Sequence, residues 1–143
     1  MTDPVQVTEI EAVTAVHDAF YAAVELADAA AMDAMWDAGD DVSCVHPGWT
    51  PLHGRSKVLR SWAAIMAGTQ ELHFLLTDVR VRVDGDVAVV TCTENILTGE
   101  VVEGGRVGGI GAAAATNVLR RRDGVWRLLA HHASPLPAEG PDD

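Results

Sequence analysis

The amino-acid sequence predicts an α+β fold, in which helices from the first half of the chain pack on an antiparallel sheet formed by the second half. Apolar residues recur every three or four positions up to about residue 67, as they do on helices that are buried along one side. From Leu72 onward the period changes to two, which is typical of half-buried strands. Asp84-Gly85 and Asp123-Gly124 are strong signals for hairpin turns, so we expect the strands to form a meander.

Three helices are expected in the first half. A capping box of Thr8 and Glu11 predicts the start of the first helix. Asp28 is a suitable cap for a second, shorter helix that ends at Gly39, and a third helix is expected over residues 55–67. The apolar stripes of these helices are, in order, Ile10, Val13, His17, Phe20, Tyr21 and Val24; Met32, Met35 and Trp36; and Val58, Leu59, Trp62, Ile65 and Met66.

A short strand and four long strands are expected. The short strand covers Val42–His46, and the alternation of side chains places Cys44 and His46 on one face. Six glycines from Gly99 to Gly111 separate the two hairpins and predict a mobile loop or a bulged strand edge. The long strands are expected to begin at Leu72 and to cover Val87–Leu97, Ala112–Arg122 and Val125–Ala133.

The hairpins predict which side chains share a face of the sheet. If each Asp-Gly pair forms the whole turn, Val83 opposes Asp86 and Arg122 opposes Val125. The inner face of the first hairpin then holds Val79, Val81, Ala88, Val90 and Cys92, together with Thr77, Glu94 and His73. The inner face of the second hairpin holds Ala113, Ala115, Asn117 and Leu119, together with Leu128, Ala130 and His132.

A run of small residues on the third long strand predicts a cavity. Alanine is depleted in strands, yet it occupies every position from Ala112 to Ala115. These small side chains would face helices that carry Trp36 and Trp62, and unfilled apolar space in a core often marks a ligand site. The alternative is that large side chains from the helices fill this space.

Length and charge limit the classes of function. The chain has 143 residues and a formal net charge of −11, so one domain is expected and nucleic acid and anionic membranes are poor partners. We expect a core over residues 8–134 and a flexible tail over residues 135–143. The start lacks the pattern of a signal peptide, and no apolar run reaches the roughly 20 residues of a membrane-spanning helix. A cytoplasmic location is therefore expected, with Cys44 and Cys92 as reduced thiols.

Short strings along residues 8–134 resemble SnoaL-like proteins of the nuclear transport factor two-like superfamily. The resemblance implies a cone-shaped barrel whose strongly curved sheet wraps around the first helix and opens into an apolar pocket. It also implies homodimers that pair through the outer face of the sheet, which here carries Arg80, Arg82, Thr91, Thr93, Arg120 and Arg127. The strings are Trp36, Val45-His46-Pro47-Gly48-Trp49, Leu52-His53-Gly54-Arg55, Ser61-Trp62, Asp123-Gly124-Val125-Trp126-Arg127 and His131-His132-Ala133-Ser134.

Ketosteroid isomerase shares this fold, and the resemblance implies roles for a few positions. Its general base is an Asp just before a Pro on the first short strand, where this sequence has His46, and a His can act as a base near neutral pH. Its oxyanion tyrosine lies on the first helix, close to Tyr21. Its oxyanion Asp is matched by Thr116 or Asn117, so the acid pair is absent and steroid isomerisation is not supported.

We predict His46 and Glu94 as catalytic residues. A buried carboxylate among apolar neighbours should have a raised pKa and could work as an acid or a base. Two alternatives stay open, because His46 could instead satisfy a backbone group in the core and a register error of one residue would move Glu94 outside. The predicted ligand-binding residues are Tyr21, Trp36, Trp62, Met66, Cys92, Asn117 and His132, although the doublet leaves open whether His131 or His132 points inward.

No metal or cofactor is predicted. His46, His53, His132 and Cys44 lack the paired spacing of a zinc site, such as HxxxH or CxxC. The segment from Gly109 superficially fits a dinucleotide-binding GxGxxA, but a strand and Arg120–Arg122 follow it where a helix and an acidic residue are needed.

The sequence therefore predicts a protein that binds a small, mostly apolar organic molecule and catalyses proton transfer on it, as an isomerase, cyclase or lyase does. A non-enzymatic ligand-binding or accessory protein remains an alternative, as does a dimerisation module with a filled pocket. This fold hosts unrelated functions, so the resemblance does not choose between these alternatives.

Overall fold

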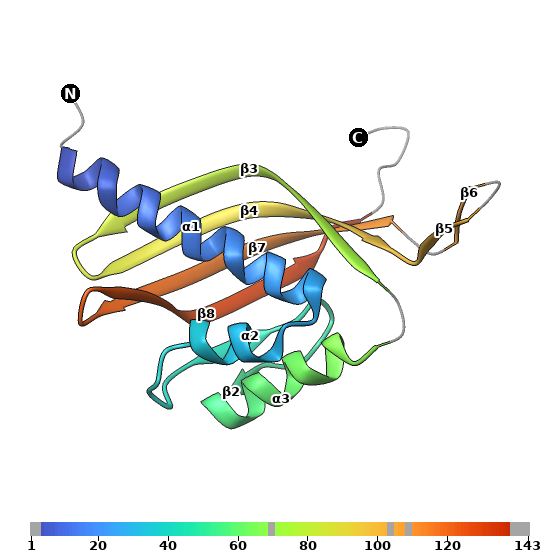
Figure 1. Cartoon of the computed structure of the whole chain (residues 1–143), viewed down its shortest axis with the longest axis horizontal. Coiled ribbons are helices and arrows are strands. Elements are labelled where there is room, and N and C mark those ends of the chain that lie inside the picture. The colour runs from blue at the N-terminus through green and yellow to red at the C-terminus, as the bar shows by residue number, and fades with distance from the viewer. Residues whose placement is uncertain (1–3, 69–70, 103–104, 108–109, 138–143) are drawn as a thin grey trace.

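Three helices cover one face of a curved six-stranded sheet (Figure 1). The structure, a computed structural model, describes residues 4–68, 71–102, 105–107 and 110–137. The strands lie in the order β2-β1-β8-β7-β4-β3, and all neighbours are antiparallel except β1 and β8, which are parallel. This arrangement confirms the predicted α+β fold of helices packed on a mostly antiparallel sheet.

The helices are α1 (Pro4–Leu26), α2 (Ala29–Met35) and α3 (Arg55–Met66). The predicted capping box is wrong, because α1 begins at Pro4, a residue well suited to a first helical position, and the Thr8 hydroxyl donates to the Pro4 carbonyl oxygen within the helix. The predicted cap of the second helix is confirmed, since the Asp28 carboxylate accepts from the backbone N–H of Ala31 at 3.1 Å. Within the described residues, no helix is long and apolar enough to cross a membrane.

All four predicted long strands are present, and the structure adds three short ones. The connection rich in glycine contains the two-stranded sheet of β5 and β6, and its residues 103–104 and 108–109 lie outside the described ranges. The strands are β1 (Ser43–Val45), β2 (Leu52–His53), β3 (Leu72–Asp84), β4 (Val87–Thr98), β5 (Glu100–Val102), β6 (Gly105–Val107), β7 (Ile110–Arg122) and β8 (Val125–Pro135).

The end of β8 is held to the sheet. The strand runs through Pro135, and the backbone N–H of Leu136 donates to the carbonyl oxygen of Ala112 at 2.9 Å. The first residues of the predicted flexible tail are therefore hydrogen-bonded, while residues 138–143 lie outside the described ranges.

The register of the first hairpin differs from the prediction in two ways. Asp84 pairs with Val87, so the turn is Gly85-Asp86 and Val83 does not oppose Asp86. A β-bulge between Thr77 and Arg80 then reverses the inward and outward order along β3. The predicted inner positions His73, Thr77 and Val79 are therefore exposed, and Leu72, Phe74 and Leu76 pack against the core instead. On β4, the predicted inner residues Ala88, Val90, Cys92 and Glu94 are all buried.

The second hairpin begins in the predicted register and then shifts by one residue. Arg122 pairs with Val125 as expected, but an irregularity between Val118 and Leu119 changes the pairing beyond it. Asn117 consequently pairs with His131, which is buried, and His132 is exposed. The prediction that His132 lies on the inner face is wrong for this reason.

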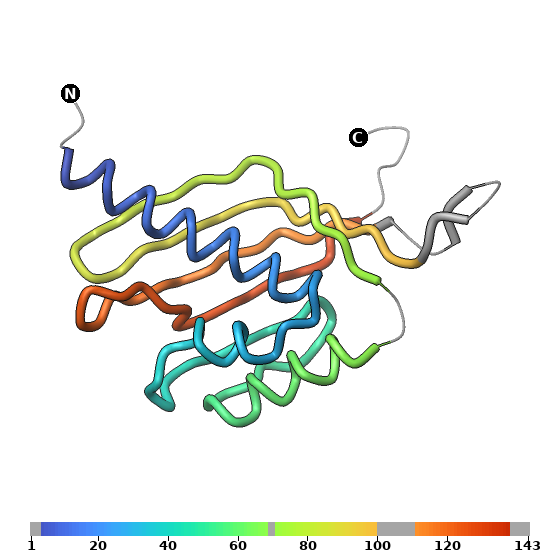
Figure 2. Tube along the Cα trace, viewed as in Figure 1, coloured from blue at the N-terminus to red at the C-terminus, as the bar shows by residue number. Residues whose placement is uncertain are grey.

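The core lies between the sheet and the helices. Figure 2 shows α1 running diagonally across the sheet, with α2 and α3 beside it. The ring of Phe20 lies at the centre, with edge-to-face contacts to Tyr21, Trp36, Trp62 and His131 at centroid distances of 4.9 to 6.4 Å. These aromatic contacts join α1 to α2, α3 and β8.

Candidate functional site

A cavity of about 160 Å³ lies beside this aromatic core, among α1, α3, the loop after β1 and the strands β3, β4 and β8. Most of its wall is apolar or aromatic, and a few polar groups converge on it, as is typical of small-molecule sites. Its lining residues are Tyr21, Val24, His46, Pro47, Trp49, Trp62, Ile65, Leu72, Phe74, Glu94, Ile96 and His131.

Glu94 is the acidic group of the cavity. It is buried on β4, where its Oε2 accepts a hydrogen bond of 2.5 Å from the Tyr21 hydroxyl of α1. Burial raises the pKa of Glu94 above its usual value, although the hydrogen bond from Tyr21 works in the opposite direction. Burial and the neighbouring charge of Glu94 also raise the pKa of the Tyr21 hydroxyl, which therefore stays protonated. Glu94 can thus hold a proton at a pH at which an exposed carboxyl has lost it.

Asn117 connects this pair to two histidines. Its Nδ2 donates to the Tyr21 hydroxyl oxygen at 3.1 Å and lies 2.9 Å from Nε2 of His17, while its Oδ1 lies 2.5 Å from Nδ1 of His131. An amide oxygen only accepts, so His131 carries its proton on Nδ1, and His17 must accept at Nε2. The side chains of Glu94, Tyr21, Asn117 and His131 therefore form one directional chain across β4, α1, β7 and β8.

Both histidines in this network are uncharged at neutral pH. Burial lowers the pKa of His17 to about 4. Burial, followed by the nearby imidazoles of His46, His17 and His132, lowers the pKa of His131 to about 3. With its proton on Nδ1, neutral His131 keeps Nε2 as a free hydrogen-bond acceptor at the cavity wall.

His46 stands just after β1 on the same cavity wall. Its Nε2 lies 2.8 Å from the Ser61 hydroxyl oxygen, and that hydroxyl donates to the carbonyl oxygen of Val58 at 2.6 Å. His46 must therefore donate from Nε2, which leaves Nδ1 as its basic nitrogen. Burial lowers the pKa of His46 to about 4. The rings of Trp49 and Trp62 pack against the imidazole, with ring centroids 4.7 and 4.6 Å from its own. The imidazole is thus an uncharged acceptor with a fixed orientation.

The structure brings together some of the predicted site residues and separates others. Tyr21, His46, Trp62 and Glu94 line the cavity. Asn117 and Cys92 lie behind that wall, where both contact the Tyr21 hydroxyl. Three predicted ligand-binding residues lie elsewhere: Trp36 in the core, with its indole N–H directed at the sulfur of Met32; Met66 at a neighbouring depression; and His132 on the exposed side of β8.

The alanine run does not form the cavity wall. Ala113 and Ala115 are buried, but neither lines the cavity, so the predicted location of the space is wrong. Phe74 was not predicted as a wall residue, and the doublet left open whether His131 or His132 points inward. The bulges on β3 and β8 decide both positions, although the apolar alternation of Leu72, Phe74 and Leu76 was a usable signal for an inward face.

The two free cysteines, Cys44 and Cys92, are buried. Burial raises the pKa of Cys44 to about 12 and that of Cys92 to about 11, so neither supplies a thiolate at neutral pH. Within the described ranges, no three His, Cys, Asp or Glu side chains lie together as metal ligands do.

A curved sheet that holds helices over an apolar cavity with a few polar groups defines the class of nuclear transport factor two-like proteins. Residues 13–139 match the model of the SnoaL-like domain, and the chain belongs to this family.

Solved structures of similar proteins agree with this assignment. One is a candidate dehydratase of the NTF2-like family from Streptomyces avermitilis, with 49% sequence identity, a TM-score of 0.78 and coverage of 92% of this chain and 98% of that chain. Another is a candidate calcium/calmodulin-dependent protein kinase type II association domain from Thiobacillus denitrificans, with 35% identity, a TM-score of 0.71 and coverage of 87% and 94%.

A curated relative is F-box protein SKIP8 of Arabidopsis thaliana, which is 28% identical over 125 residues. The match covers 87% of this chain but only 50% of the relative, so the chain spans about half of that protein's length.

Proposed function

We propose that the cavity binds a small, mostly apolar organic molecule and that its side chains move protons on that molecule, as in an isomerase or a dehydratase-type lyase. The observation that carries this proposal is a buried carboxyl of raised pKa, Glu94, in the same apolar cavity as two uncharged imidazoles, His46 and His131. Groups whose environments shift their pKa values in this way are frequent at catalytic sites. The 49% identity to a candidate dehydratase further supports a lyase.

In this mechanism His46 is the base and Glu94 is the acid. Nδ1 of His46 takes a proton from a carbon next to a carbonyl group, and Glu94 gives its proton to the departing hydroxyl oxygen. A carbon–carbon double bond forms and water leaves. The carboxylate that remains on Glu94 favours the imidazolium that forms on His46, so the cavity as a whole stays uncharged during the step. Return of the proton from His46 to Glu94 completes the cycle.

The test is turnover of small hydroxylated carbonyl compounds, with loss of water followed by mass spectrometry. His46→Ala and Glu94→Gln are each expected to lower turnover by about 100-fold or more, the usual contribution of an acid or base. Glu71→Gln is the matched control, because Glu71 borders only the neighbouring depression. Full turnover by both cavity variants would contradict the assigned roles.

A non-enzymatic ligand-binding protein is the second candidate. The hydrogen bond of His46 to Ser61 and that of Glu94 to Tyr21 favour this alternative, because both polar groups already have partners without a substrate. Binding of a compound without any product would support it.

We also propose that two copies pair through the outer face of the sheet. Leu75 is 62% exposed there on the edge strand β3, where it pairs with Asn95 of β4, and the neighbouring pair is Thr77 and Thr93. Light scattering after size-exclusion chromatography measures the mass in solution, and a monomer mass would contradict this proposal.

A further inference from the structure

We propose that the occupant of the cavity is an uncharged molecule with a single, largely flat ring and a hydroxyl group, an inference that rests on the proposed function and narrows its substrate class. Four features of the cavity support this class: its volume, the rings in its wall, the charge state of its polar groups, and the pairing of a donor with an acceptor.

The volume fits one ring. A cavity of about 160 Å³ is close to the size, about 150 Å³, at which an apolar protein cavity holds a benzene molecule. To lie wholly inside this volume, a fused two-ring system would require the walls to move. Because Phe20 and the aromatic residues around it are packed ring against ring, such movement would break many contacts in the core.

The wall favours a flat occupant. Six of the described lining side chains carry aromatic rings: Tyr21, His46, Trp49, Trp62, Phe74 and His131. Trp49 is 47% exposed and lies beside His46, held by a turn in which its backbone N–H donates to the His46 carbonyl oxygen and Gly48 takes a φ of 82°. This tight turn presents the indole at the rim, where it can cover the ring of a bound molecule.

The charge state of the wall favours an uncharged occupant. The described lining residues include no Lys or Arg, and burial raises the pKa of Glu94 and lowers those of His46 and His131, which favours the uncharged form of each group. A charged molecule would therefore be transferred from water without an opposite charge to meet it, which is costly. Anions face a further obstacle, because Glu25 and Glu71 border the adjoining depression, which shares Val24, Ile65 and Leu72 with the cavity.

The remaining polar atoms call for an oxygen substituent. Oε2 of Glu94 accepts from the Tyr21 hydroxyl, so the uncharged carboxyl that burial favours can donate from Oε1, and Nε2 of His131 can accept. A hydroxyl group both donates and accepts, so it can satisfy both protein groups inside an otherwise apolar wall.

The test compares five probes of related shape by isothermal titration and by the fluorescence of the wall tryptophans. Benzyl alcohol is expected to bind at least about tenfold more tightly than benzoate and benzylammonium, which differ from it mainly in charge, because each tenfold step corresponds to 1.4 kcal/mol and an unpaired buried charge costs more. It is also expected to bind more tightly than cyclohexylmethanol, which is not flat, and 2-naphthylmethanol, which has two rings.

Two variants locate the binding. Ile96→Trp fills the cavity and is expected to abolish binding of benzyl alcohol, whereas Leu75→Trp, on the 62% exposed outer face, is expected to leave it unchanged. If Ile96→Trp does not fold, Trp49→Ala replaces it and is expected to weaken binding severalfold by removing the ring at the rim.

The outcomes separate the two proposals. Equal or tighter binding of benzoate, benzylammonium or the naphthyl compound overturns the present inference and leaves the cavity as a binding site. Failure of every probe to bind overturns both this inference and the proposed function. Binding that survives Ile96→Trp overturns the present inference, because the bound molecule would then lie elsewhere.

Discussion

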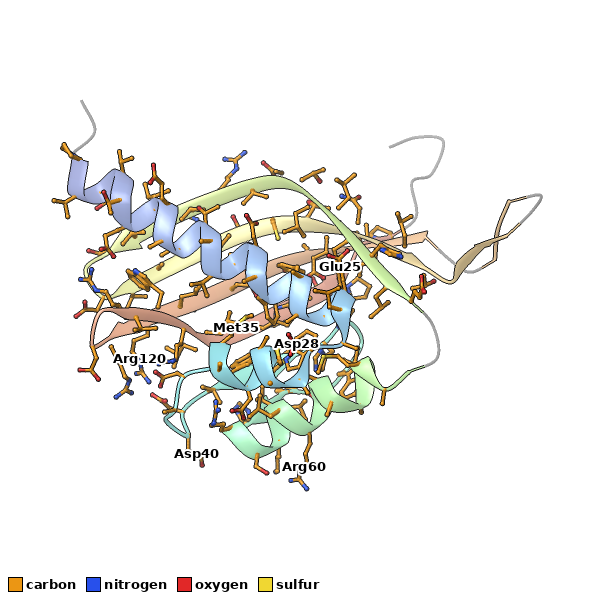
Figure 3. All side chains as sticks on the ribbon, viewed as in Figure 1. Glu25, Asp28, Met35, Asp40, Arg60 and Arg120 are labelled. Atoms are coloured by element: carbon orange, nitrogen blue, oxygen red, sulfur yellow. The ribbon has the colours of Figure 1, made fainter. Side chains whose placement is uncertain are left out.

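Strand β7 contributes to two networks of polar side chains that differ in the charge state of their buried groups. At Asn117 it joins the cavity network, in which Glu94, Tyr21 and His131 are hydrogen-bonded and burial favours the uncharged form of each. Three residues later, at Arg120, it joins an ionic network whose members keep their charges. Figure 3 shows Arg120 toward one end of the sheet and Glu25, which borders the depression beside the cavity, toward the other.

The ionic network is centred on a fully buried carboxylate. Both oxygens of Asp37 are paired, with Arg120 at 2.5 Å and Arg122 at 3.0 Å, and Arg120 also binds Asp41. Burial alone would raise the pKa of Asp37, but hydrogen bonds from Arg120 and Gly39 and the charges of both arginines hold it below its usual value. Paired charges thus connect the segment after α2 to β7, whereas the cavity network avoids charge.

The comparison predicts a large effect of acid on stability. His17, His46 and His131 accept protons near pH 6.5 when unfolded but only at pH 4 or below when folded, so stability is lost as the pH falls from 6.5 toward 4. Glu94 works in the opposite direction, because the folded protein holds its proton above the unfolded value of 4.5 and stability is lost as the pH rises. Where the three histidines are protonated in the unfolded state only, they lower stability by at most about 4 kcal/mol for each pH unit, and Glu94 reduces that slope.

Urea unfolding at several pH values between 7 and 4.5 measures this slope. Asp37→Asn is the matched control, because the pKa of Asp37 is lowered and its contribution is lost only below that range. The variant should lower stability without changing the slope. A flat profile in the parent protein would mean that the cavity histidines are charged when folded, and the contrast between the two networks would not hold.

The sequence predicted the elements of both networks better than it predicted their partners. Helices and strands follow from local periodicity and turn residues, which is why all three helices and four long strands are in place. Bulges depend on pairing between distant strands, and the two in this sheet reverse the positions of Phe74 and His131. Glu94 and Asn117 were predicted correctly as inward residues because each lies on a strand whose alternation is unbroken.

An effect of intermediate size is expected when the two carboxylate partners of Arg120, one buried and one exposed, are removed in turn. Asp37→Ala removes the buried carboxylate and leaves Arg120 without its main partner, so a loss of about 3–5 kcal/mol in the free energy of unfolding is expected. Asp41→Ala removes the other partner of the same arginine, but Asp41 is 61% exposed, so its loss should cost far less stability than the loss of Asp37. Denaturant unfolding of the two variants gives the difference directly. Equal losses would show that burial does not set the strength of these pairs.

The smallest expected effect on stability comes from removing one hydroxyl group of the cavity network. Tyr21→Phe keeps the ring contacts of α1 but removes the hydroxyl that donates to Glu94, at a cost of about 1 kcal/mol in stability. That hydrogen bond lowers the pKa of Glu94 against the effect of burial, so its removal should raise the pKa of Glu94 further.

Carbon-13 NMR of the Glu94 carboxyl over a pH titration measures this change. If Glu94 is the proton donor of a reaction, the alkaline limb of the rate profile should move upward in Tyr21→Phe by the same amount as the NMR value, since both report loss of the same proton. A rate profile that stays in place while the NMR value moves would assign Tyr21 and Glu94 to the architecture of the cavity and the acid role to another group. A fall in the pKa of Glu94 would contradict the direction of the hydrogen bond on which the uncharged network depends.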